Sequence, residues 1–105
     1  MLNMGWIMDA KIFAVLQQYQ LTDLEIADMV TIAPMLDVTT FAEFAANCQV
    51  LVKHGYPQSD LDYLFLANPN LFVVAAADLD ADLKKLAAKC DDIEIVLKEN
   101  PAAMW

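Results

Sequence analysis

Three aspartates, Asp78, Asp80 and Asp82, alternate along the sequence in the pattern that opens a helix-loop-helix calcium site. Such a loop also needs glycine at its sixth position, for a sharp turn, and glutamate at its twelfth, as a bidentate ligand. This sequence has Leu83 and Lys89 at those positions. We therefore predict that the aspartates belong to the start of a helix, where the helix dipole favours negative charge.

One histidine and two cysteines are the other side chains that could act as nucleophile, base or metal ligand. Cys48 and His54 are six residues apart, a poor spacing for contact on one helix, and a buried, unpaired thiol is inert. His54 precedes Gly55 and is expected to cap a helix end, while Cys48 and Cys90 are expected to be reduced. We predict no enzyme activity, no cofactor and no metal site.

The overall charge excludes several classes of ligand. Fifteen aspartates and glutamates face six lysines, with no arginine, which gives 105 residues a formal net charge of -9. A field of this sign repels phosphate backbones and anionic lipid, so nucleic acid is not expected as a partner. Hydrophobic residues make up 59% of the chain, which predicts exposed apolar surface for a protein partner.

No segment has the composition of a membrane anchor. The longest uncharged stretch, residues 63–77, is interrupted by Asn68, Pro69 and Asn70, whereas a membrane span needs about 20 predominantly apolar residues. The first residues lack the basic region and cleavage site of a signal peptide. We therefore expect no contact with the membrane and a cytoplasmic location.

The apolar residues recur with the period of an α-helix, and no strand-like alternation is found, so we predict an all-α fold. Residues 41–52 carry the clearest apolar stripe. Thr40 and Glu43 form a capping box at its start, and Gly55 marks its end.

This pattern of a capped helix recurs along the chain. Similar start signals occur at Thr22, Ser59 and Asp91, and a proline follows each of them, at Pro34, Pro69 and Pro101. We predict a helix at residues 9–20, repeat units at 22–55 and 59–90, with long helices at 41–54 and 79–90, and a half unit at 91–105. Such units bury their apolar faces by stacking. The expected architecture is a single compact domain, a short stack of helix-proline-helix repeats with about six helices.

The repeat resembles that of the mitochondrial transcription termination factors over about residues 21–105. The matching residues are Leu24, Ile26, Pro34, Met35 and Leu36, then Leu61, Leu64, Pro69, Leu71 and Phe72, then Ile93, Val96, Leu97 and Pro101, together with the turn at residues 53–61. The resemblance implies a curved solenoid that binds nucleic acid through basic residues. This chain departs from that pattern because it has no arginine and because Lys84, Lys85 and Lys89 alternate with aspartates.

Aromatic residues at the termini and at a turn are the candidates for an interface: Trp6, Tyr56 and Trp105. Tyr63 and Phe72 are instead predicted to lie in the core. The leading hypothesis is a non-catalytic protein-protein interaction module with an unidentified partner, with a homodimer as one form of it. The alternatives are a nucleic-acid-associated regulator and an enzyme whose apolar face encloses a hydrophobic substrate.

Overall fold

The computed structural model describes residues 8–100, which form helices without any strand and so confirm the all-α prediction. The α-helices are α1 (Ala10–Gln18), α2 (Asp23–Ile32), α3 (Phe41–Lys53), α4 (Leu61–Ala67), α5 (Ala76–Ala87) and α6 (Ile93–Glu99). Three 3-10 helices lie between them: η1 (Pro34–Asp37), η2 (Gln58–Asp60) and η3 (Pro69–Phe72).

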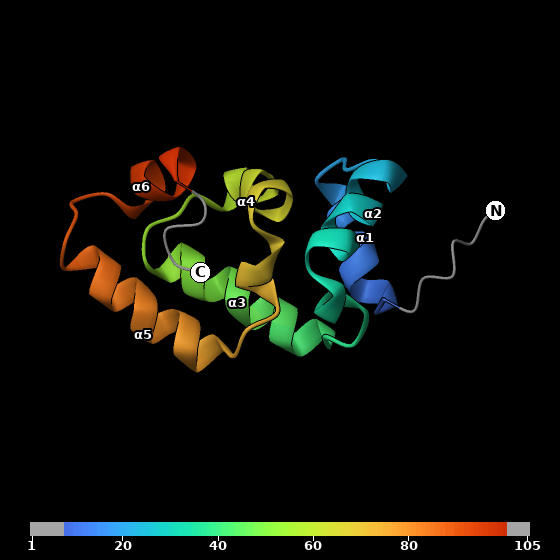
Figure 1. The fold of residues 1–105 in the computed structure, drawn as a ribbon, viewed down its shortest axis with the longest axis horizontal. Coiled ribbons are helices and arrows are strands. Elements are labelled where there is room, and N and C mark those ends of the chain that lie inside the picture. The colour runs from blue at the N-terminus through green and yellow to red at the C-terminus, as the bar shows by residue number, and fades with distance from the viewer. Residues whose placement is uncertain (1–7, 101–105) are drawn as a thin grey trace.

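The helices form two rows that pack against each other. Along one row α1 contacts α3 and α3 contacts α5, and along the other α2 contacts α4 and α4 contacts α6. In Figure 1, α3 and α5 run along the lower side of the molecule, with α4 and α6 above them and α1 and α2 at one end. Helix η3 connects the rows because it packs against both α3 and α4. This is the arrangement expected of stacked helical repeats.

The turn from a short helix to a long one has the same backbone geometry in both units. Helices η1 and η3 each begin with a proline, and the residue before it is extended, with φ and ψ of -126° and 77° at Ala33 and -152° and 73° at Asn68. The amides of these residues donate to the carbonyls of Met29 and Leu64, both at 2.8 Å. The conformation therefore recurs at a separation of 35 residues.

The ends of α1 and α3 also correspond at this separation. Gln20 and Gly55 both adopt a left-handed conformation, with φ of 66° and 105°. The next amides, of Leu21 and Tyr56, donate back to helix carbonyls at 3.2 and 3.0 Å. Glycine adopts this conformation freely, whereas glutamine has a Cβ that makes it unfavourable. The same turn is therefore relaxed after α3 and strained after α1.

Two of the predicted helix starts have the predicted capping box. The amides of Thr22 and Thr40 donate to the carboxylates of Glu25 and Glu43 at 2.8 and 3.0 Å, and both glutamate amides donate to the threonine hydroxyls at 3.2 Å. These reciprocal bonds satisfy amides that the first turn of a helix leaves free. Helices α2 and α3 therefore begin where the sequence predicted.

Other helix boundaries differ from the prediction. Ser59 does not cap a helix, because the chain first forms the 3-10 turn η2 and α4 begins afterwards without a side-chain cap. Asp92 rather than Asp91 caps α6, accepting from the amide of Glu94 at 2.9 Å. Helix α5 spans Ala76–Ala87 instead of 79–90, because Ala75 is the last extended residue, with φ of -64° and ψ of 132°, and the helix begins directly after it.

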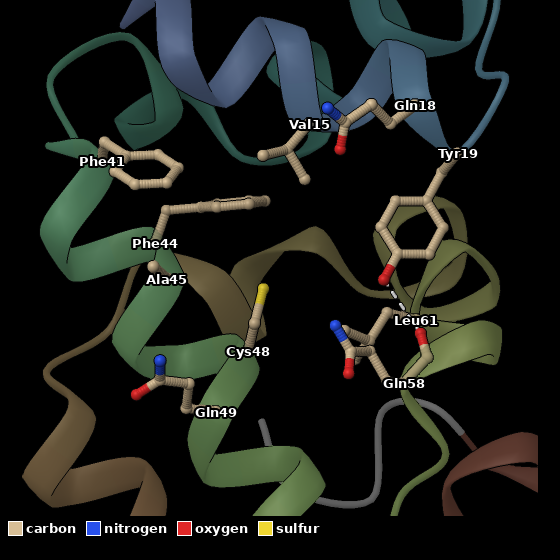
Figure 2. A pocket seen from close by; sticks show the side chains of 10 residues that line it. All are labelled: Val15, Gln18, Tyr19, Phe41, Phe44, Ala45, Cys48, Gln49, Gln58 and Leu61. Atoms are coloured by element: carbon tan, nitrogen blue, oxygen red, sulfur yellow. Dashed lines mark hydrogen bonds between the residues drawn. The ribbon is translucent and has the colours of Figure 1, made fainter.

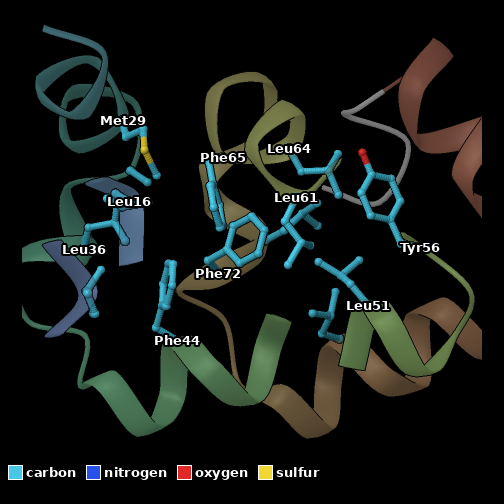
Figure 3. Close-up of a cluster of buried hydrophobic side chains, with 14 of the residues drawn as sticks. Leu16, Met29, Leu36, Phe44, Leu51, Tyr56, Leu61, Leu64, Phe65 and Phe72 are labelled. Atoms are coloured by element: carbon cyan, nitrogen blue, oxygen red, sulfur yellow. The ribbon is translucent and has the colours of Figure 1, made fainter. Parts of the chain in front are cut away.

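Aromatic rings occupy the centre of the core, between the two rows. The ring centroid of Phe65 lies 4.7 Å from that of Phe72 and 5.6 Å from that of Phe44, while the ring of Tyr19 meets Phe65 edge to face at 5.3 Å. Figure 3 shows the three phenylalanines side by side between α3 and α4. Phe72 is fully buried, as predicted. Tyr63 is not a core residue: it is 42% exposed, and its hydroxyl donates to the carbonyl of Lys98 at 2.7 Å.

The two left-handed positions give opposite expectations for stability. Gln20→Gly should raise the free energy of unfolding by about 1 kcal/mol, because glycine removes the Cβ penalty at φ of 66°. Gly55→Ala should lower it by about 1 kcal/mol through backbone strain alone, because a Cβ there would meet no atom within 4 Å. Urea unfolding followed by circular dichroism measures both. A destabilised Gln20→Gly variant would contradict the correspondence between the two turns.

Candidate functional site

The three aromatic residues predicted as an interface do not form one among the residues that the structure describes. Trp6 and Trp105 lie outside residues 8–100. The prediction that Tyr56 is an exposed contact residue is wrong: it is 1% exposed, and its hydroxyl donates to the carbonyl of Asp60 at 3.0 Å. The left-handed Gly55 reverses the chain and directs the ring into the core, where burial raises the pKa of Tyr56 to about 12.

The aspartates of the calcium-like sequence lie on α5, as predicted, and one of them pairs with the only histidine. Asp80 Oδ1 lies 2.7 Å from His54 Nε2, and Lys53 and Lys84 each place Nζ 3.4 Å from an oxygen of Asp80. The hydrogen bond from His54, followed by those from the lysines, lowers the pKa of Asp80 to about 2. Across residues 8–100, no group of three or more His, Cys, Asp or Glu side chains could hold a metal ion. The cluster therefore joins α3 to α5.

A groove of about 350 Å³ opens between α1, α3 and the start of α4. It is lined by Val15, Gln18, Tyr19, Phe41, Phe44, Ala45, Cys48, Gln49, Gln58 and Leu61. Figure 2 shows the sulfur of Cys48 pointing into the space between Phe44, Tyr19 and Leu61. A second hollow of about 360 Å³ adjoins it and adds Val52 and Lys53 to the lining.

The groove lining carries no carboxylate and no activated nucleophile. Burial raises the pKa of the Cys48 thiol to about 12, so this thiol stays protonated at neutral pH. The hydroxyl of Tyr19 donates to the carbonyl of Gln58 at 2.9 Å, and burial raises the pKa of Tyr19 as well. The groove can hold an apolar group beside glutamine amides, but these residues supply neither a general acid nor a base at neutral pH.

Helix α2 carries apolar residues both on its buried side and outside it. Ile26 and Met29 are fully buried against the rest of the molecule. Leu24 lies opposite them, and Ile32 lies at the edge of the buried side; they are 79% and 51% exposed. Met35 of η1 is 58% exposed. We call the exposed residues Leu24, Ile32, Met35 and Val38 the α2 face.

Exposed apolar side chains belong mostly to the row that contains α2. The large apolar residues exposed within residues 8–100 are Leu24, Ile32, Met35, Val38, Val52, Tyr63, Leu66 and Ile95. Of these, only Val52 lies on the row of α1, α3 and α5. The sequence indicated excess apolar surface without locating it, although the signal was present in α2, whose apolar residues are not confined to one stripe.

The α2 face has carboxylates but no cations nearby in sequence. Between residues 12 and 52 the chain has Asp23, Glu25, Asp28, Asp37 and Glu43 and no lysine. In the described part of the chain, every ion pair uses a cation at position 53 or beyond. The segment from residue 12 to residue 52 therefore exposes apolar side chains and carries five carboxylates without a lysine, and the nearest lysines in sequence are Lys11 and Lys53.

The Asp80 cluster should make stability depend on acid pH. Because the pKa of Asp80 is about 2 in the folded protein and near 3.9 when unfolded, its carboxylate stabilises the fold above about pH 4. That contribution is lost as the pH falls from about 4 to 2. The free energy of unfolding should fall less steeply over this range in Asp80→Asn than in the wild type, with His54→Gln in between. Identical slopes for all three proteins would contradict the assignment.

The protonated state of Cys48 predicts slow alkylation. Iodoacetamide should modify Cys48 in the folded protein more than about tenfold slower than in urea, because the thiolate is the reactive form. Mass spectrometry of peptides measures modification at Cys48 and Cys90 separately. Rapid, complete labelling of Cys48 in the folded protein would reinstate it as a nucleophile.

In comparisons with protein-family models, curated proteins and solved structures, no match to this chain was found. None of the helices within residues 8–100 is long and apolar enough to cross a membrane. A fold alone does not determine a function, so the function has to be inferred from the α2 face and the groove.

Proposed function

We propose that this chain is a non-catalytic protein-binding module of the cytoplasm, and that it binds its partner through the α2 face. The observation that carries the proposal is that α2 is apolar on its exposed side, with Leu24 79% and Ile32 51% exposed. A helix at the surface of a protein normally confines its apolar residues to the buried stripe. Large apolar side chains exposed beyond that stripe are typical of an interaction site.

The composition of the α2 face fits protein recognition. Leucine and isoleucine provide apolar area that a partner can remove from water, at about 25 cal/mol per Å² buried. Met35 has a flexible, polarisable side chain, 58% exposed, that can adapt its shape to a partner. The proposed cytoplasmic location is supported by Cys48 and Cys90, which are both free, as is usual in the reducing cytoplasm.

The residues that line the groove support a non-catalytic role. Its lining contains a thiol with a pKa of about 12, three glutamines and apolar side chains, and these groups cannot transfer protons at neutral pH. Enclosure of a hydrophobic substrate would also require a catalytic group beside it. The groove therefore favours a binding function over an enzymatic one.

The recurrence at 35 residues supports a fold-level likeness to the transcription termination factor repeats, which we keep as a proposal. The distribution of lysines argues against extending this likeness to the binding of nucleic acid. Lys53 and Lys84 approach Asp80 at 3.4 Å, and Lys98 binds Asp60 and Glu94 at 2.7 and 2.8 Å. Cations that are already paired with carboxylates have less to gain from contact with phosphates.

Affinity capture from the native cell extract, with the wild type and with variants of the α2 face as bait, tests the proposal. Leu24→Ser combined with Ile32→Ser should reduce the captured partner more than about tenfold, because two anchors of the interface are removed. Ile95→Ser is the matched control: Ile95 is 53% exposed on α6, close to the 51% of Ile32. It should capture as well as the wild type.

Two outcomes would contradict the proposal. Equal capture by the wild type and the double variant would mean that the α2 face is not the binding site. Loss of all captured protein after nuclease treatment would favour the nucleic-acid-associated regulator. Because all three substituted residues are exposed, both variants should retain the wild-type circular dichroism spectrum.

A further inference from the structure

We propose that the partner segment which docks on the α2 face is a basic amphipathic helix, with lysine or arginine placed between its apolar residues. This inference rests on the proposed function and specifies the chemistry of the partner. It comes from the order of residues along the exposed side of α2 and from the charge of this end of the molecule.

The exposed side of α2 alternates apolar and acidic residues along one line. Leu24, Asp28 and Ile32 are spaced by four residues, so they follow one another on the same side of the helix. All three are exposed. A carboxylate therefore lies between two apolar side chains. A complementary surface must place a cation between two apolar groups.

The carboxylates around the α2 face have no cation of their own. Asp23 and Asp28 lie on α2, and Asp37 ends η1. Among residues 8–100, no lysine or histidine lies within 4.0 Å of these carboxylates, since the ion pairs of this region involve other acids. Complementary charge accelerates encounter and selects the partner, while each exposed ion pair adds little to the affinity. The apolar contacts would supply most of the affinity, and the charges would supply the selectivity.

A helix fits this face better than an extended segment. Backbone amides and carbonyls within α2 bond to each other along the helix, so a strand would find no free edge to pair with. Recognition must go through side chains at helical spacing. A helix that presents apolar residues three and four positions apart matches the spacing of Leu24, Asp28 and Ile32.

A second copy of the chain is a poor occupant of the α2 face. A symmetric contact through this face would bring the carboxylates of Asp23, Asp28 and Asp37 from both copies into one interface. Each copy also carries a formal charge of -9. Repulsion of like charges disfavours such a dimer, and it disfavours an anionic lipid surface for the same reason.

Binding of designed peptides tests the inference directly. The probe is a fluorescently labelled synthetic helix with leucine on one face and lysine elsewhere, and the control peptide has glutamate in place of lysine. Fluorescence anisotropy at low and at physiological salt should show binding of the lysine peptide, weakened by salt, and none of the glutamate peptide. Leu24→Ser with Ile32→Ser should weaken it more than about tenfold, and Asp28→Asn about threefold, while Ile95→Ser should leave it unchanged.

Four results would overturn the inference. Equal binding of both peptides, or no effect of Asp28→Asn, would show that charge does not select the partner. Unchanged binding by the Leu24 and Ile32 double variant would place the peptide elsewhere. Sedimentation that shows a dimer dissociated by the same double variant would make a second copy the occupant. If both peptides bind equally but the double variant still fails to capture the partner from the cell extract, the proposed function stands and only the partner class is wrong.

Discussion

The constraint on which this structure depends is the proline that begins each of the 3-10 helices η1 and η3. Proline has no amide hydrogen, so it cannot continue a helix, and it forces the preceding residue into an extended conformation. Ala33 and Asn68 take that conformation and end α2 and α4. The turn that follows carries the chain from the row of α2, α4 and α6 to the row of α1, α3 and α5. It buries Leu36 and Leu71 completely. Two prolines thereby set both the reversal of the chain and part of the core.

Local chemistry could be predicted from the sequence, whereas the direction of side chains after a turn could not. The capping boxes at Thr22 and Thr40 depend on residues three positions apart, and both form. Ser59 has the same sequence signal, but the chain there makes a 3-10 turn first. The predicted unit starts at residues 22, 59 and 91 are therefore unevenly spaced, although the backbone conformation recurs at a separation of 35 residues. Tyr56 followed a glycine and looked exposed, because a sequence does not show where a left-handed residue directs the next ring.

The site was harder to predict because it depends on contacts between distant residues. His54 and Asp80 are 26 residues apart, and no local pattern relates them. The groove depends equally on how α1 packs against α3. The part of the α2 face that lies on α2 is different, since its signal lies within ten residues: Ile26 and Met29 require one buried side, which leaves Leu24 opposite it and Ile32 at its edge. An apolar helix that retains an outward side can be recognised from sequence once its buried side is known.

The placement of the lysines connects the stability of one end of the molecule to the recognition surface at the other. Lys53 and Lys84 pair with Asp80 between α3 and α5, and Lys98 joins α6 to the start of α4 by binding Asp60. Lys98 also lies 5.9 Å from the ring centroid of Tyr56, so it belongs to the packing of that end. With these cations paired there and no lysine between residues 12 and 52, no ion pair within residues 8–100 involves the carboxylates of α2. The charge distribution that joins the last helices thus leaves α2 with carboxylates outside any ion pair of the described chain, which is the feature on which the proposed basic partner helix depends.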